Sequence, residues 1–454
     1  MKKHIIVLLS CCLLTSFAFS QTIPQLVNEV NLDSLVKTVS EFSGEVPTVV
    51  NGNTVTILNR QQANNDLAAD YLVQKLQRLD NLTVVNQSFN TNGHNIIATQ
   101  IGKTNPNNIY IVSAHYDSVT NYCADDNASG VATVLEIARL LSTQCLDNTI
   151  VYALWDEEEN GLNGSAYYAN QAYTNGDTIL GVLNIDMMAY DGNNDMNFDI
   201  DVRNYANSLG IKDDILSILN NPTYGFSLIA NVVNPGTLDS DHASFWNKQY
   251  SAVLVGESWA TNDHTLHYHM ATDRLADFNL PYYHQLAKLI FGYMVTKAGL
   301  VAIDNTISAT ATTLTATQNS ANYQWYNCET NLPIDGETGQ SFSPSSNGSY
   351  AVKVTLGSCS EMSECFFFET LTTSIFAVDE VKVYPNPVQS FLKVDTSIED
   401  SKQLKLYTIT GKLLLSKETT SKSIRLDVKQ FPKGIYFLSV KTKDKSGTYK
   451  IVKE

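Results

Sequence analysis

The sequence predicts an α/β domain with a mixed, mostly parallel central sheet flanked by helices, followed by two small all-β sandwich domains. Three observations support this prediction. From residue 21 to about 300, short apolar runs alternate with helical patterns, as in a mixed α/β domain. Beyond about residue 302, the composition shifts to Thr, Ser, Asn and Gly with short alternating runs. The length of 454 residues has room for about two to four domains.

The overall composition narrows the class of protein. Hydrophobic residues make up 43% of the chain and charged residues 17%, which excludes wholesale disorder. The formal net charge is −16. Residues 379–454 carry 15 Lys+Arg against 9 Asp+Glu, so the preceding part carries 15 against 37 and is strongly acidic. An acidic body of this kind argues against nucleic-acid binding.

The first 20 residues have the pattern of a secretory signal peptide. Lys2 and Lys3 precede an apolar run from Ile5 to Phe19, and small residues stand at cleavage spacing before Gln21. A membrane anchor is the alternative, but about 15 apolar residues fall short of the roughly 20 that span a bilayer. The sequence therefore predicts export, with no stable transmembrane segment after signal removal.

Residues 21–300 are predicted to form the α/β domain. Ala128 to Leu141 carries apolar residues at helical spacing, begins beside Asp126 and Asn127, and is expected to cover the sheet. Four apolar runs rich in β-branched residues have the pattern of strands buried on both faces: Ile109 to Val112, Thr149 to Trp155, Ile179 to Ile185 and Ala252 to Val255.

Two β domains are predicted to follow. Residues 302–370 include the alternating runs Tyr323 to Tyr326 and Tyr350 to Val354, which indicate a small immunoglobulin-like sandwich. Residues 378–454 form another small sandwich, with strands expected around Leu392 to Val394, Leu404 to Tyr407 and Ile435 to Val440.

The cysteines suggest one disulfide in an oxidising compartment. Cys328 has Cys359 or Cys365 as its expected partner, and the sequence leaves the choice open. Cys123 and Cys145 flank the predicted helix, whose length separates them by roughly 20 Å, so we expect them not to pair with each other.

Polar residues follow each of the four predicted strands. The strands run into His115-Tyr116-Asp117, Asp156 to Glu159, Asp186 and Glu257. Since the crevice beyond the carboxyl strand ends is the usual ligand site of an α/β sheet, we expect these side chains to meet there. Imidazole and carboxylates together suit a divalent metal, most commonly zinc, although cobalt and manganese accept similar ligands.

Each of these residues also has a structural interpretation. Asp117 lies two residues after His115 and can orient the imidazole of a metal ligand, but a surface His near an acid is common. Asp126 can be a helix cap or a carboxylate that bridges two cations. The acidic run from Asp156 to Glu159 can be a solvated loop or a site whose field a cation relieves.

Six motifs in order resemble the secreted di-zinc aminopeptidases of metallopeptidase family twenty-eight. The resemblance covers about residues 60–298. The motifs are Ala114 to Ser118, Ala124 to Gly130, Glu158 to Ser165, Asn184 to Met187, Ser240 to Phe245, and His269 four residues before Asp273.

This resemblance implies two Zn²⁺ per chain, with Asp126 bridging them and Glu158 as general base. Asp117 would orient His115. The implied zinc ligands are His115, Asp126, Glu159, Asp186 and His269, with His and Asp on one ion and Glu and His on the other. His264 and His267 are interpreted as exposed loop residues, because only His269 has the family spacing to Asp273.

The resemblance also has departures. The Ser240-Asp241-His242 segment lacks the flanking cysteine pair of some members, so the specificity pocket is expected to differ. Trp246 and Trp259 are interpreted as core residues at least as readily as pocket residues. The residues implied to line the pocket are Met187, Leu254, Gly256 and Tyr268, which suggests an apolar substrate side chain.

The last unit resembles the type-A sorting domain of type IX secretion in Bacteroidetes. The matching segments are Tyr384 to Pro387, Leu406 to Lys412 and Phe431 to Phe437, and the chain ends in Lys450-Ile451-Val452-Lys453. This implies handling by the type IX machinery, then release or attachment to the cell surface. The 302–370 domain is interpreted as a spacer, with substrate or glycan binding as the alternative.

The sequence thus predicts a secreted zinc aminopeptidase that acts on the free N-termini of peptides or proteins. Its preference for a free amine rests on the resemblance alone. A carboxypeptidase and a glutaminyl cyclase share this fold and stay open as alternatives, as does an inactive peptidase-like adhesion scaffold. The complete set of metal-ligand and base residues argues against the scaffold.

Overall fold

The computed structural model describes residues 22–61, 65–356, 359–369, 374–376, 380–443 and 445–454. The predicted signal peptide, residues 1–20, lies outside these described residues. Within them, no helix has the length and apolar character needed to cross a membrane. The chain divides into two compact units, and each is described by itself. The first unit holds the chain up to Asn305 together with residues 318–322 and 353–364, and the second holds the remainder.

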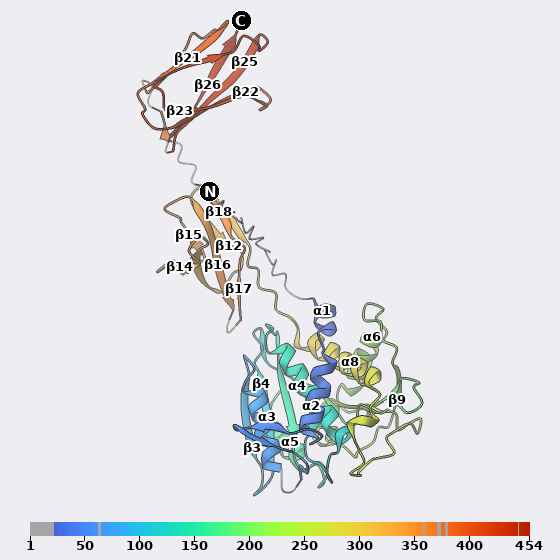
Figure 1. Cartoon of the computed structure of the whole chain (residues 1–454). Helices are drawn as coiled ribbons and strands as arrows, with labels where there is room; N and C mark the ends of the chain where they lie inside the picture. Colours follow the sequence, from blue (N-terminus) through green and yellow to red (C-terminus); the bar gives the residue numbers. More distant parts are fainter. Residues whose placement is uncertain (1–21, 62–64, 357–358, 370–373, 377–379, 444) are drawn as a thin grey trace, which may run out of the picture. The chain divides into compact units, whose positions relative to one another are not determined.

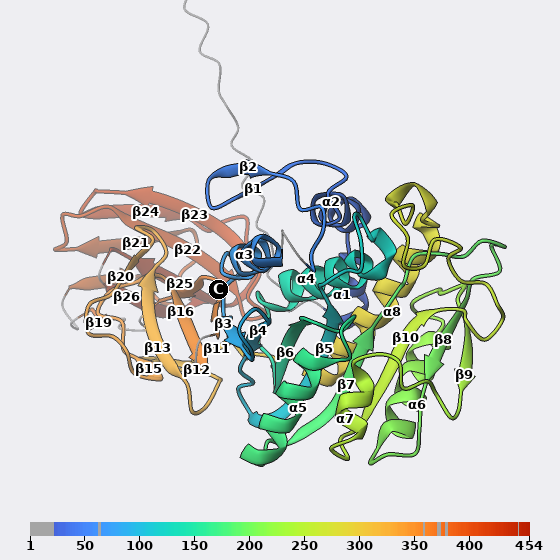
Figure 2. The same ribbon diagram turned by 90° about the horizontal axis from the view of Figure 1, so that it is seen from below.

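An eight-stranded mixed sheet forms the centre of the first unit, as Figures 1 and 2 show. Its four central strands are parallel and adjacent, in the order β6-β5-β7-β10. The predicted fold class is confirmed. In sheet order the strands are β3 (Thr83–Ser88), β4 (His94–Gln100), β6 (Asn148–Trp155), β5 (Asn105–His115), β7 (Ile179–Ile185), β10 (Ala252–Glu257), β8 (Asn197–Asp201) and β9 (Ile229–Val233).

The four buried runs of the sequence are the four central strands. Ile179–Ile185 matches β7 at both ends, and the others are longer in the structure than in the prediction. Along β6, Ile150, Tyr152 and Leu154 join one core cluster, whereas Val151 and Ala153 join another. A strand that contributes to a core on each side must be apolar throughout, which is why the sequence shows a continuous run.

Helices cover both faces of this sheet. The helices α5 (Asn163–Asn175) and α7 (His242–Trp246) contribute to the smaller core cluster, on the opposite face from α4 in Figure 2. The larger cluster is built by the other helices, and α4 packs on β5 and β6 as predicted. These helices are α1 (Ile23–Asn28), α2 (Leu32–Phe42), α3 (Asn65–Leu76), α4 (Gly130–Leu141), α6 (Ser208–Leu219) and α8 (Leu280–Ala298).

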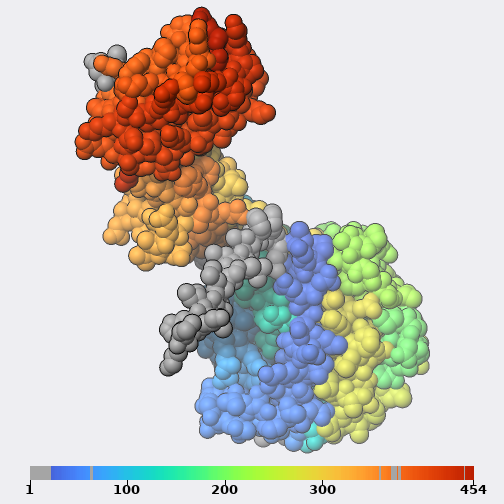
Figure 3. All heavy atoms as spheres, turned by 45° about the horizontal axis from the view of Figure 1, so that its top comes forward, coloured from blue at the N-terminus to red at the C-terminus, as the bar shows by residue number. Residues whose placement is uncertain are grey.

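Among the described residues, the first helix lies against the last helix of this unit. Residues of α1 contact α8, and Figure 3 shows the blue N-terminal segment beside the yellow segment that contains α8. Three short elements complete the unit: β1 (Thr48–Val50), β2 (Asn53–Val55) and the 3₁₀ turn η2 (Leu275–Asp277). Residues 22–60 are therefore an integral part of the α/β fold.

The first unit also contains a disulfide that the sequence did not predict. Cys145, after α4, pairs with Cys359, which begins β17 (Cys359–Met362). As expected, Cys123 does not pair with Cys145, and Cys123 is the free cysteine among the described residues. The connection is long range, with a sequence separation of 214 between the partners, so no local spacing could have indicated it.

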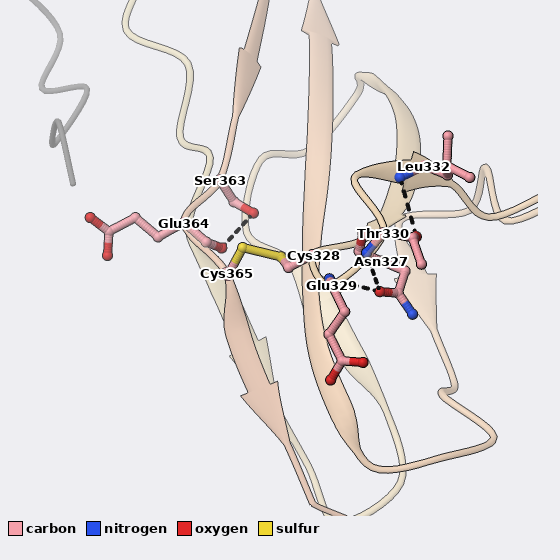
Figure 4. Close-up of a disulfide and its surroundings, with 8 residues drawn as sticks. All are labelled: Asn327, Cys328, Glu329, Thr330, Leu332, Ser363, Glu364 and Cys365. Carbon is pink, nitrogen blue, oxygen red and sulfur yellow. Dashed lines mark hydrogen bonds between the residues drawn. A yellow bond between two sulfur atoms is a disulfide. The ribbon is translucent and has the colours of Figure 1, made fainter. Parts of the chain in front are cut away.

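Short strands from 307 to 368 form two small sheets. Cys328 pairs with Cys365, which settles the choice that the sequence left open; Figure 4 shows this bond beside Asn327, whose side chain accepts the amide of Glu329. One sheet has the order β11-β12-β15 and the other β14-β13-β16-β17, with β18 also on β16. Their bounds are β11 (Ile307–Ala309), β12 (Leu314–Ala316), β13 (Asn322–Asn327), β14 (Leu332–Pro333), β15 (Ser341–Phe342), β16 (Gly348–Leu356) and β18 (Phe366–Phe368).

The C-terminal strands enclose a separate apolar core that includes Leu392, Leu404 and Leu438. All three predicted strands are present. One sheet has the order β19-β26-β25-β22-β23 and the other β20-β21-β24. Their bounds are β19 (Ser374–Ile375), β20 (Val381–Tyr384), β21 (Phe391–Thr396), β22 (Lys402–Thr408), β23 (Leu413–Thr419), β24 (Ser423–Asp427), β25 (Gly434–Lys441) and β26 (Lys445–Lys453). The predicted domain boundaries at 300, 302, 370 and 378 stay a proposal.

Candidate metal centre

The five predicted zinc ligands converge at the carboxyl ends of the parallel strands. His115 ends β5, Asp186 follows β7, and Glu159 lies in the loop after β6. Asp126 lies in the turn η1 (Ala124–Ser129), which leads into α4, and His269 lies in the loop after β10. Because β6, β5 and β7 are neighbours, the topology brings three of these side chains to one edge of the sheet.

Two carboxylates lie close to the imidazole of His115. The Nε2 atom of His115 lies 3.2 Å from Asp126 Oδ1 and 3.2 Å from Asp186 Oδ1. Both His115 and Asp126 are almost completely buried. This cluster therefore presents one imidazole nitrogen and two carboxylate oxygens toward a single small volume.

Two carboxylate oxygens also lie close to the imidazole of His269, and one of them is the second oxygen of Asp126. His269 Nε2 lies 3.5 Å from Asp126 Oδ2 and 3.2 Å from Glu159 Oε2. The ligand atoms of His115, Asp126 and Glu159 also lie within 4.8 Å of one another, which is close enough for a shared metal site. Asp126 thus stands between two groups of donors, one on each of its oxygens.

Asp117 contacts both the imidazole and the acidic loop. Its Oδ1 atom lies 3.4 Å from His115 Nδ1, consistent with the predicted orienting position. Its two oxygens also accept the backbone amides of Glu158 and Glu159, at 3.1 and 3.2 Å. The sequence did not predict this second contact, which fixes the backbone that carries both glutamates.

Asp126 is not the cap of the following helix. The side chain of the next residue, Asn127, accepts the amide of Gly130 at 3.0 Å, at the start of α4. The carboxylate of Asp126 is left facing the two histidines, and its Oδ2 has no hydrogen-bond partner among the described residues. The bridging interpretation of Asp126 is therefore the one that its surroundings suit.

Asp186 is held by a second polar contact. Ser240 donates its hydroxyl to Asp186 Oδ2 at 2.7 Å, while Oδ1 faces His115. Burial raises the pKa of Asp186, but the charge of His115 and the hydrogen bonds from His115 and Ser240 outweigh it, so the pKa is lowered. In the metal-free protein, Asp186 is therefore ionised at neutral pH.

Glu158 and Glu159, in the loop after β6, have raised pKa values, unlike Asp186. Burial and the nearby carboxylates Asp241, Asp186 and Glu159 together raise the pKa of Glu158 to about 10, although the charge of His115 opposes this rise. The pKa of Glu159 rises to about 8, again mainly through burial. Both groups need a nearby positive charge to be ionised at pH 7.

The donor set fits divalent cations. Five residues offer two imidazoles and three carboxylates, which are the nitrogen and oxygen ligands that zinc accepts. Among the described residues, buried polar atoms without a hydrogen-bond partner include Asp126 Oδ2, Glu159 Oε1 and both carboxylate oxygens of Asp241. Because an uncompensated buried carboxylate is costly, bound cations account for this arrangement better than a neutral core does.

Aromatic rings surround His269. Its ring stacks on Tyr268 with centroids 3.7 Å apart, and Tyr268 meets Trp259 edge to face at 5.3 Å. Trp246 lies in the core, but Trp259 is 45% exposed, so the core interpretation of Trp259 is wrong. His264 and His267 were expected to be exposed, but both are half-buried. His264 stacks on Trp259, and His267 contacts Thr272 through Nδ1 at 2.9 Å.

The residues implied to line the specificity pocket have different environments. Met187 is buried, Leu254 is half-buried, and Tyr268 is 41% exposed. A Cβ atom on Gly256 would lie 2.3 Å from the carbonyl oxygen of Asp186, so glycine is needed for this close approach. The pocket-lining role of the four residues stays a prediction.

Sequence reasoning missed two residues behind the centre, Arg60 and the carboxylate of Asp273. Asp273 served only as a spacing marker, and Arg60 is a single basic residue in a loop, with no local motif to single it out. A second acidic group, Asp191, Asp195 and Asp263, also brings oxygens within 4.8 Å of one another. These three carboxylates accept nearby backbone amides and lie apart from the five predicted ligands.

Two family models match the chain. Residues 95–294 match the model described as peptidase family M28. Residues 382–454 match the model described as a secretion system C-terminal sorting domain. The first match covers the strands that carry the candidate centre, and the second covers nearly all of the last predicted domain.

Curated relatives resemble parts of the chain. Leucine aminopeptidase 1 of Trichophyton equinum is 31% identical over 261 residues, 51% of this chain and 67% of the relative. A probable zinc metalloprotease of Pyricularia oryzae is 43% identical over 111 residues, 22% of each chain. Leupeptin-inactivating enzyme 1 of Streptomyces exfoliatus is 31% identical over 211 residues, 43% of each. The chain spans about a fifth of the length of the first curated relatives it matches.

Solved structures share the fold. The LapA aminopeptidase of Legionella pneumophila aligns with a TM-score of 0.53 at 16% identity, covering 62% of this chain and 75% of that one. LapB from the same organism aligns with a TM-score of 0.52 at 18% identity, with the same coverage of 62% and 75%.

Proposed function

This chain belongs to peptidase family M28, and we propose that it is a zinc aminopeptidase that hydrolyses N-terminal peptide bonds at the candidate metal centre. The observation that carries the proposal is the position of Asp126 between two groups of donors. One of its oxygens lies 3.2 Å from His115 Nε2, and the other lies 3.5 Å from His269 Nε2. A carboxylate placed in this way can serve two cations at once.

We assign the ligands according to this geometry. His115 and Asp186 would hold one zinc ion, Glu159 and His269 the other, and Asp126 both. Two zinc ions would polarise the scissile carbonyl and lower the pKa of a bound water toward about 7. Asp117 would fix His115 and, through two backbone amides, the loop that carries Glu158 and Glu159.

Glu158 is the proposed general base. Its carboxylate would accept a proton from the attacking water and then give that proton to the leaving amine. The new carbon–oxygen bond would form first, and the bond between the carbonyl carbon and the amide nitrogen would then break as the amine takes the proton. Nearby positive charge would be needed to ionise Glu158, because burial raises its pKa to about 10 in the metal-free protein.

The C-terminal sorting domain directs the protein to secretion or to attachment at the cell surface. We propose that the type IX secretion machinery handles it and that the substrates are peptides or proteins with free N-termini. The half-buried Leu254 and the exposed Tyr268 support a preference for an apolar N-terminal side chain.

Hydrolysis of leucine p-nitroanilide beside its N-acetylated form tests this function. The mature chain, loaded with zinc, is expected to cleave only the free-amine substrate. The E158Q variant is expected to lose about 10²- to 10⁴-fold in kcat while it keeps its zinc. Equal cleavage of both substrates would contradict an aminopeptidase. Zinc binding without any cleavage would favour a carboxypeptidase, a cyclase or a scaffold.

A further inference from the structure

Arg60 is fully buried behind the candidate metal centre. It lies in the loop between β2 and α3, and none of its surface is exposed. Burying a guanidinium costs free energy unless its donors and its charge are compensated. No ion pair within 4.0 Å joins Arg60 to a carboxylate in the part of the chain that the structure describes. The hydrogen-bond donors of the guanidinium must therefore be satisfied by other groups.

The Arg60 guanidinium donates to backbone carbonyls. Nε donates to Tyr116 at 2.8 Å, and Nη1 donates to Tyr122 at 2.7 Å. Nη2 donates to Cys123 at 2.9 Å and reaches the carbonyl of Asp126 at 3.4 Å. Arg60 thus holds the segment just after His115 together with the turn that carries Asp126.

This turn has a backbone conformation that needs support. Tyr122 and Cys123 both have a positive φ, 71° and 46°, which is unfavourable for residues with a side chain. The carbonyls of both residues are acceptors for Arg60. Since hydrogen bonds to a charged donor are stronger than neutral ones, the guanidinium can stabilise the turn.

Asp273 binds the same turn through the backbone amides of the turn. Its carboxylate accepts the amide of Asp125 at 2.9 and 3.0 Å and the amide of Asp126 at 3.0 Å. Its own backbone carbonyl accepts the amide of Ala124 at 3.3 Å. The Arg60 guanidinium therefore donates to carbonyls of the turn, while the Asp273 carboxylate accepts its amides.

We propose that Arg60 and Asp273 are positioning residues that hold the backbone of Asp126 between them and thereby fix the carboxylate shared by the two zinc sites. This inference rests on the proposed metal centre. Because Asp126 presents one oxygen to each group of ligands, a displaced Asp126 weakens both sites together. A residue that supports only one ligand weakens one site.

Zinc affinity at each site tests the proposal. The two dissociation constants of the mature chain are measured by competition with a chromophoric chelator, well below the unfolding temperature. R60K keeps the positive charge but has one donor nitrogen in place of three, so it cannot make the same set of hydrogen bonds. R60M removes the charge and the hydrogen bonds. For R60M we expect each zinc site to weaken about 10- to 100-fold, as for other residues that orient metal ligands, and for R60K a smaller loss at both sites.

Two variants serve as references. Arg203 also donates to a backbone carbonyl, that of Gly236 at 2.8 Å, and lies over Trp246, so R203M controls for loss of a structural arginine. Ser240 contacts only Asp186 among the predicted ligands, so S240A is expected to weaken one zinc site alone. D273N tests the opposite side of the turn and is expected to weaken both sites.

The outcomes are distinguishable. Loss at both sites in R60K and D273N, with R203M unchanged, supports the proposal. Wild-type affinity in the folded R60K protein, or loss at one site only, overturns it even if the unfolding temperature falls, because a merely structural arginine would change stability alone. If R60M does not fold, R60K and D273N decide. A wild-type protein that binds no zinc would instead overturn the proposed function.

Discussion

The two sides of the metal centre are held in different ways. His115 is 1% exposed, ends the central strand β5, and pairs with an Asp186 that Ser240 fixes. His269 is 40% exposed, lies in the loop after β10, and has a positive φ of 60°. The buried side is built on rigid sheet, whereas the other side depends on a loop and a ring stack. We therefore expect unequal metal affinities at the two sides.

Removing one histidine from each side should have the largest effect. H115A is expected to weaken zinc at the buried side by more than about 100-fold, beyond the loss caused by orienting residues. H269A should reduce zinc affinity at its side by a smaller factor, because water can replace an exposed ligand more easily than a buried one. Chelator competition on both variants measures the two losses. Equal losses would break the comparison.

Zinc binding should require the release of a proton on both sides of the centre. Burial lowers the pKa of His115, but the charges of Asp186 and Glu158 and hydrogen bonds to other carboxylates outweigh it, so this pKa lies well above its ordinary value. On the other side, burial raises the pKa of Glu159 to about 8. Each group must lose its proton before it can bind a metal, so below pH 8 we expect the affinity of both sides to fall by up to about tenfold per pH unit. Zinc titrations between pH 6 and 8 measure this, and an affinity that stays constant with pH on either side would contradict it.

The stability of the metal-free protein should fall as the pH rises. The folded pKa values of Glu158, about 10, and of Glu159 and Asp125, about 8, all lie above the ordinary carboxyl range. The folded state therefore binds more protons, so this contribution is complete below about pH 4 and is lost as the pH rises through 8 to 10. The Tm in chelator should be lower at pH 8.5 than at pH 5.5. Zinc should remove this trend, and an increase of Tm with pH in chelator would refute the assignment.

The ring stack on the exposed side should have the smallest effect. Y268A removes the ring that lies 3.7 Å from His269. A stacked pair contributes about 0.5–1.5 kcal/mol, so zinc affinity at that side should fall by roughly 2- to 10-fold. The Y268F variant keeps the ring and is the matched control. An unchanged affinity in Y268A would show that the loop holds His269 without the stack.

Much of the buried side could be predicted from the sequence. His115 and Asp186 end continuous apolar runs, and such runs become adjacent parallel strands whose ends must meet. The turn that holds Asp126 could not be predicted. Its supports are Arg60 and Asp273, 66 residues before and 147 after it, and neither belongs to a local pattern that indicates contact with this turn.

Loop residues were predicted less well for a related reason. Trp259 is apolar enough for a core, and its exposure depends on the path of a loop that no periodicity encodes. The long-range disulfide of Cys145 was likewise missed, because its partner Cys359 lies in a different predicted domain, 214 positions further along the chain. Strand ends follow from composition, whereas contacts between loops follow from the assembled fold.

The two disulfides affect what a single proteolytic cut does to the protein outside the cell. Their order along the chain is interleaved, since Cys328 lies before Cys359 and Cys365 after it. Every peptide bond between Cys145 and Cys365 therefore lies inside at least one closed covalent loop. A single cut by a neighbouring protease anywhere in that stretch leaves one molecule, with its strands still tied to its sorting domain. For a protein that is secreted or attached to the cell surface, a nick need not separate its parts.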